Sequence, residues 1–166
     1  MVKKILFLLV LVITADNIVF AQTANKLIGK SYAYCKFSLP GTIIAPGAGK
    51  RPQTIIQERI IYLEIKDTVK PVIKTIYSGK YHFSNSITAI SNFPESPGIN
   101  LTASKAVIIK KRAGYSLWRI DIFPDDDQIT VPSVVLNNYV VKGSLNGKPF
   151  TVSVKKETQL SGDMRY

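Results

Sequence analysis

The stretch Tyr139–Lys156, with the sequence YVVKGSLNGKPFTVSVKK, constrains the fold of this chain more than any other. Runs rich in β-branched residues flank Asn146-Gly147, a dipeptide that favours a type I′ turn because both of its central residues need a positive φ. A two-residue turn also sets the register of the strands, so that Gly143 faces Phe150. The stretch therefore predicts a β-hairpin.

In that register the hairpin has one apolar face and one polar face. Val141 pairs with Val152 on the apolar face, and the ring of Phe150 can cover the gap that Gly143 leaves. Lysine, serine and threonine dominate the other face, which is the alternation of a sheet with one side in water. Pro149 has no N–H donor, so its strand is expected to lie at a sheet edge or to begin there.

Residues 1–21 have the features of a cleavable signal peptide. Lys3 and Lys4 precede the apolar run Ile5–Ile13, and Val19 and Ala21 suit positions −3 and −1 of a cleavage site. The apolar run is too short to cross a bilayer as a helix, although a retained anchor is the alternative. We expect an exported protein, periplasmic or extracellular, with no transmembrane segment after cleavage and with residues 22–166 as a single β domain.

Cys35 is the single cysteine, so no disulfide can form within the chain. An exported domain without disulfides favours a bacterial origin. In the segment Lys26–Leu39 the alternation of side chains places Cys35 on the inner face of a predicted strand. We therefore expect a buried structural cysteine rather than a nucleophile.

The chain carries a formal net charge of +11, which becomes about +10 when the signal segment is removed with Lys3, Lys4 and Asp16. A surplus of this size attracts anionic partners. For an exported protein the candidates are an anionic glycan, lipid head groups or an acidic protein surface. Nucleic acid is not expected, since no base-stacking motif is present. The alternative is that the lysines only keep the protein soluble.

Two segments concentrate this charge. The first is the Pro- and Gly-rich loop Pro40–Gln53, which does not match a phosphate-binding loop because Ile44 and Arg51 stand where that motif needs glycine and serine or threonine. The second is a basic turn that precedes an aromatic residue. The candidate binding residues are Lys50, Arg51, Lys110, Lys111, Arg112 and Tyr115.

Lys105–Phe123 predicts a second hairpin, with Ile109 opposite Trp118. A four-residue loop, Arg112–Tyr115, built on a type I turn would connect its strands, and Val107 would face Ile120. Trp118 and Phe150 are then expected to share one interior.

The remaining chain adds short β runs separated by turn residues. Thr54–Ile65 is followed by a returning strand, Val69–Tyr77, and Ser78-Gly79 turns the chain again, whereas Asn92–Ser104 is expected to be an irregular crossing. No segment after residue 21 has a helical period. The pattern predicts an all-β fold, an antiparallel β-sandwich of about eight strands, with an up-and-down β-barrel as the alternative.

The residue inventory argues against most catalytic and metal sites. His82 is the single histidine, and pairing it with Cys35 would require two strand residues to meet. The acidic run in Pro124–Gln128 lacks the spacing of a calcium loop, and Glu58 with Glu64 is too common a spacing to indicate glycan hydrolysis. We expect no metal, no cofactor and no enzymatic activity. The main hypothesis is a non-catalytic binding or envelope-associated module; a carrier of small apolar ligands and a hydrolase are the alternatives.

Overall fold

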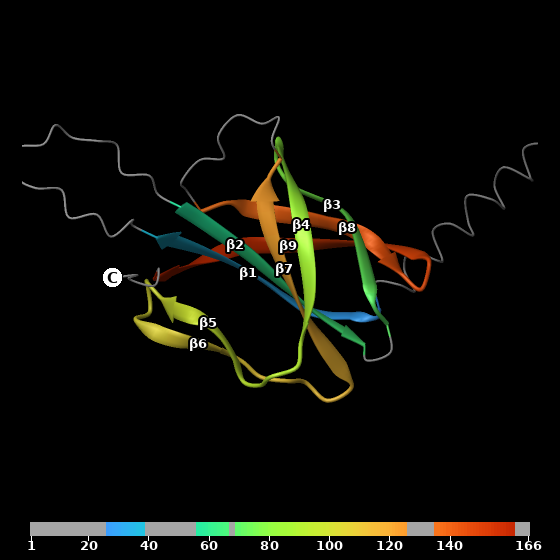
Figure 1. Cartoon of the computed structure of the whole chain (residues 1–166), viewed down its shortest axis with the longest axis horizontal. Coiled ribbons are helices and arrows are strands. Elements are labelled where there is room, and N and C mark those ends of the chain that lie inside the picture. Colours follow the sequence, from blue (N-terminus) through green and yellow to red (C-terminus); the bar gives the residue numbers. More distant parts are fainter. Residues whose placement is uncertain (1–25, 39–55, 67–68, 126–134, 162–166) are drawn as a thin grey trace, which may run out of the picture.

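A computed structural model of the chain describes residues 26–38, 56–66, 69–125 and 135–161 (Figure 1). The predicted signal segment, Lys50, Arg51 and most of the acidic run lie outside these residues. The described part consists of strands and turns. The strands are β1 (Ile28–Ser38), β2 (Ile56–Lys66), β3 (Pro71–Ser78), β4 (Tyr81–Ile90), β5 (Glu95–Asn100), β6 (Lys105–Ile109), β7 (Tyr115–Pro124), β8 (Asn137–Leu145) and β9 (Lys148–Ser161).

Seven of these strands form a closed barrel in the order β1-β2-β7-β4-β3-β8-β9, and β9 pairs with β1 to complete the ring. The closing pair is parallel and the other neighbours are antiparallel, so the barrel is mixed. The prediction of an all-β fold is confirmed. Of the two predicted architectures the structure has the barrel, although its strand order is not that of a simple up-and-down meander.

The prediction favoured a sandwich, but the last strand, β9, closes the sheet into a barrel. β9 has 14 residues, and it pairs with β8 over its first part and with β1 over its second part. One strand thereby joins the two ends of the seven-stranded sheet into a ring, with β9 paired to β1 from Glu157 onward. The crossing Asn92–Ser104, predicted to be irregular, contains β5. It therefore adds a strand to the sheet instead of linking two sheets.

The hairpin of β8 and β9 has the predicted register. Gly143 pairs with Phe150, and Asn146 and Gly147 have φ values of 51° and 75°. A Cβ atom on Gly143 would lie 2.3 Å from the carbonyl oxygen of Val72 and 2.8 Å from the Phe150 ring. Only glycine fits at this position. Pro149 lies at the second residue of β9, where the strand begins.

The second predicted hairpin is wrong in its pairing. β6 pairs with β5, whereas β7 lies between β2 and β4, so that Trp118 faces Leu63 and Ala89. The four-residue turn itself is present, since the backbone N–H of Tyr115 donates to the carbonyl of Arg112 at 3.1 Å. Gly114 has a φ of 75°, which the predicted type I turn does not allow.

Of the two predicted connections of β3, one is confirmed and the other is wrong. The turn after Ser78 joins β3 to β4 as expected, with Gly79 at a φ of 57°. β3, however, does not return along β2; its neighbours are β4 and β8. At the start of β7 and at the end of β3, the position of the turn was predicted correctly, but the more distant neighbouring strands in the sheet were not.

The core has two parts. All seven barrel strands contribute to the apolar interior, where Phe150 is buried and Trp118 packs against the same cluster, as predicted. The second part lies outside the barrel, beneath the hairpin of β5 and β6, which is seen beside the barrel in Figure 1. It contains Tyr34, Ile60, Tyr62, Ile109, Leu117 and Leu160. β2 is therefore buried on both faces.

No helix in the described ranges is long and apolar enough to cross a membrane.

Candidate functional site

The predicted basic turn lies at a corner of the barrel where β7 begins. The guanidinium of Arg112 stacks 4.1 Å from the centre of the Tyr115 ring, and its Nη1 lies 3.7 Å from Oε2 of Glu64 on β2. Lys110 and Lys111 are exposed beside it. The structure thus brings four of the six predicted binding residues together, but Arg112 and Tyr115 are already engaged within the protein. Lys50 and Arg51 are outside the described residues.

Glu64 connects this corner to the start of β1. Its side chain is almost buried and accepts a hydrogen bond of 3.1 Å from the backbone N–H of Lys30. A Cβ atom on Gly29 would lie 2.9 Å from Glu64 Oε2 and 3.0 Å from the Tyr115 ring, so glycine permits this close approach. Burial raises the pKa of Tyr32, which Glu64 raises further and Arg112 lowers. Tyr32 therefore lies within the electrostatic influence of both members of the corner's ion pair.

A groove of about 350 Å³ opens between β1 and β9. The two strands pair from Ala33 opposite Glu157 onward, and upstream of that point no pairing joins them. The groove lies where this seam opens. Its lining residues are Ser31, Tyr32, Ala33, Tyr34, Ser153, Val154, Lys155, Lys156 and Thr158.

Two adjacent lysines stand at the groove because the alternation of β9 changes phase there. Val154 and Glu157 are buried, and Lys155 and Lys156 between them are both exposed. On the neighbouring strand Asn138 has a φ of 59°, an irregularity at the same level of the hairpin. A regular strand would have turned one of these lysines inward.

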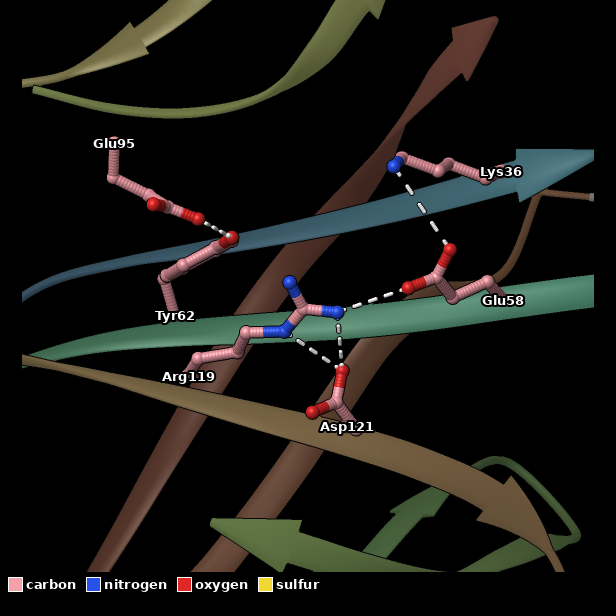
Figure 2. Close-up of polar contacts among 6 residues, drawn as sticks. All are labelled: Lys36, Glu58, Tyr62, Glu95, Arg119 and Asp121. Atoms are coloured by element: carbon pink, nitrogen blue, oxygen red, sulfur yellow. Dashed lines mark hydrogen bonds and ion pairs between the residues drawn. The ribbon is translucent and has the colours of Figure 1, made fainter. Parts of the chain in front are cut away.

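A polar network covers the outer wall of β1, β2 and β7. Figure 2 shows the Arg119 guanidinium between two carboxylates, with distances of 2.9 Å to Glu58 and 2.8 Å to Asp121. Lys36 lies 3.9 Å from the second oxygen of Glu58. These carboxylates share one guanidinium, so they neutralise it and tie three strands together.

A hydrogen bond beside this network anchors the hairpin of β5 and β6, the outer hairpin, to the barrel. The Tyr62 hydroxyl on β2 donates to Glu95 on β5 at 2.7 Å (Figure 2). Burial raises the pKa of Tyr62, and the hydrogen bond to Glu95 and its charge raise it further. The phenol is therefore held in its neutral, donating form.

The two glutamates considered for glycan hydrolysis are not brought together. Glu58 binds Arg119, and Glu64 binds Arg112. They lie on the same strand six residues apart, which corresponds to about 20 Å at the rise of a β-strand. Pairs that cleave glycosidic bonds are about 5 to 10 Å apart.

A charged network that sequence reasoning missed lies inside the barrel. Arg59 on β2 pairs with Glu157 on β9, and the Tyr139 hydroxyl donates to the same carboxylate. Arg59 Nη1 also donates to the Tyr139 oxygen at 3.0 Å, and the backbone N–H of Leu136 donates to Glu157 at 2.7 Å. The alternation of side chains along the strand could have indicated the position of Arg59. It is two residues before Ile61 and therefore lies on the same inward face.

Cys35 lies opposite Arg59 and is buried, as predicted. Burial raises the pKa of its thiol to about 12, and the nearby Glu157 contributes. His82 is exposed on β4, where its ring lies 5.9 Å from that of Tyr77. Cys35 and His82 are therefore separated, one inside the barrel and the other on its surface.

In the part of the chain that the structure describes, no group of three or more His, Cys, Asp or Glu side chains is arranged to hold a metal ion. Comparisons with protein-family models, with curated proteins and with solved structures found no match.

Proposed function

We propose that the protein is an exported, non-catalytic binding module whose lysine-rich surface engages an anionic partner. The supporting observation is that the acidic side chains and the arginines that the structure describes are paired within the protein, whereas many lysines are exposed. Within the described ranges, every acidic side chain has a partner inside the protein, and every arginine pairs with a carboxylate. The acidic residues are Glu58, Glu64, Glu95, Asp121, Asp125 and Glu157, and the arginines are Arg59, Arg112 and Arg119.

In the described part of the chain, the surplus positive charge is therefore carried by lysine. An ammonium on a flexible stem acts as a point charge, whereas arginine recognises carboxylates and phosphates through a rigid, two-pronged geometry. A surface of lysines suits an extended partner with many negative charges. Two pairs of adjacent exposed lysines provide such a surface: Lys110 and Lys111 at the corner, and Lys155 and Lys156 at the groove.

The experiment measures retention of the full chain on immobilised heparin and on vesicles that contain phosphatidylglycerol, over a range of salt. We expect binding at about 0.1 M salt and release by about 1 M, because the screening length falls from about 10 Å to about 3 Å. Retention that does not change with salt, or no retention at low salt, would contradict the proposal.

The alternative of an apolar carrier has less support from the described residues. A carrier needs a cavity in the barrel, but the interior is occupied by the large side chains of the apolar cluster and by the Arg59 network. We therefore place the binding function on the surface.

A further inference from the structure

Among the strands that the structure describes, the seam between β1 and β9 leaves part of the β9 edge without a neighbouring strand. β9 pairs with β8 along one side from Lys148 to Lys156, but on its other side the pairing with β1 begins only at Glu157. Ser153 and Lys155 belong to the earlier part and line the groove. A closed barrel has no open edge, so this segment is an exception among the described strands of the seven-stranded ring.

The register of the hairpin shows which backbone groups point into the groove. A two-residue turn is closed by a hydrogen-bonded pair, here Leu145 with Lys148, and bonded and non-bonded pairs then alternate along the ladder. Counting outward, Ser153 falls at a non-bonded pair, Val140 with Ser153. Its N–H and C=O groups are directed away from β8, toward the groove.

The side chains around this edge are suited to carboxylates. Lys155 and Lys156 are exposed at its end, and Tyr32 forms part of the opposite wall. Glu64, whose charge acts on Tyr32, is already engaged by Arg112 and by the N–H of Lys30. The groove therefore combines unpaired strand edge with positive charge.

We propose that this groove binds an extended acidic peptide segment, which adds to β9 as a short strand alongside Ser153 and Lys155. This inference rests on the proposed function and specifies its partner as a protein segment. Backbone hydrogen bonds to the strand edge provide affinity, and alternate acidic side chains meet Lys155 and Lys156. A sugar polymer would use the lysines and the tyrosine but would gain nothing from the strand edge.

The test uses the full chain and a fluorescent peptide of seven residues that alternates glutamate and threonine, measured by fluorescence polarisation. Two further peptides carry N-methyl groups on one or the other alternate set of residues. A peptide bound as a strand has one set of N–H groups facing β9, so we expect one methylated peptide to bind at least about tenfold more weakly and the other to bind normally.

The protein variants test the site. We expect the double variant Lys155→Gln/Lys156→Gln to bind the peptide about fivefold more weakly. Lys70→Gln/Lys74→Gln, which removes the same charge from exposed positions at and before β3, should change binding less than twofold. Amide hydrogen exchange at Ser153 should slow when the peptide binds.

Several results would overturn the proposal. Equal binding of the two methylated peptides, or equal effects of the two double variants, would mean diffuse attraction, and the proposed function would stand if heparin retention persisted. Protection of the Ser153 amide by a heparin tetrasaccharide but not by the peptide would identify a glycan instead. Slow exchange of this amide in the unbound protein would show that the edge is already paired. Loss of both heparin and peptide binding would contradict the proposed function itself.

Discussion

Two arginines bind carboxylates from opposite sides of the same barrel wall. Arg59 and Glu157 lie inside, with side chains 3% and 1% exposed. Arg119 and Glu58 lie outside, with side chains 29% and 43% exposed. In the interior no water can replace a lost partner, whereas on the outer wall it can. The surroundings of an ion pair, more than its presence, should therefore determine how much stability is lost with it.

The interior network of Arg59, Tyr139 and Glu157 lies where β9 begins to pair with β1. Glu157 is the first residue of β9 that pairs with β1, and its carboxylate contacts Arg59 of β2, Tyr139 of β8 and the N–H of Leu136. The network therefore sits where the last strand leaves one neighbour and joins another. We infer that it specifies the closure of the barrel as well as stabilising it.

The largest expected effect comes from removing the interior charge. Glu157→Gln leaves the buried guanidinium of Arg59 without its counter-ion and should lower the free energy of unfolding by about 3 to 5 kcal/mol. Chemical denaturation measures this loss, with Glu58→Gln as the matched exposed control. Replacing the whole pair, as Arg59→Met/Glu157→Leu, should cost less than the single change. A loss below about 1 kcal/mol for Glu157→Gln would remove the contrast between the two networks.

Alkaline pH should act on the buried thiol and on the buried phenols of both parts of the core. Burial raises the pKa of Cys35 to about 12 and also raises that of Tyr139, so the folded state keeps protons that the unfolded chain releases. Stability is then fully present below about pH 9 and is lost as the pH rises through about 12, by about 2 to 4 kcal/mol. Denaturation curves at a series of pH values test this. Cys35→Ala should flatten the decline, and constant stability up to pH 11 would contradict the prediction.

A smaller effect is expected where the outer hairpin is tied to the barrel. Tyr62→Phe removes the donor to Glu95 and should lower the free energy of unfolding by about 1 kcal/mol. Amide exchange in β5 should accelerate more than exchange in β8. A double-mutant cycle with Glu95→Gln isolates the hydrogen bond; a coupling energy near zero would mean that the contact does not stabilise the hairpin.

The smallest effect should come from the outer arginine. Arg119→Gln removes two ion pairs that water can replace, so we expect a loss of about 0.5 kcal/mol, which decreases further as salt is raised. Thermal unfolding at low and high salt measures it. A loss as large as that of Glu157→Gln would show that the outer network behaves as a buried one.

The sequence predicted those features that depend on a few adjacent residues. The turn at Asn146-Gly147 requires two positive φ values, and its register and the pairing of Gly143 with Phe150 follow from the chain alone. The basic turn was recognised in the same local way. The partner of β7 was not, because the alternation around Trp118 suits any neighbour that presents an apolar face.

The remaining features depend on contacts between distant strands. Ile60 and Tyr62 gave a signal that the outer face of β2 is covered, since an exposed face rarely carries both, but β5 and β6 had no signature that linked them to it. The groove lies where the pairing of β9 with β1 stops, and its two exposed lysines result from the change of phase at Lys155 and Lys156. Such a change cannot be derived from one strand's pattern.

The parallel pairing of β1 with β9 has a consequence for how the protein acquires its structure. The first described strand finds its second neighbour only in the last one, so the ring stays incomplete until nearly all of the described chain is present. Contacts between such distant segments are slow to form, which places this domain among folds that assemble in milliseconds to seconds. A nascent chain that lacks β9 leaves the free sides of β1 and β8 available to other molecules.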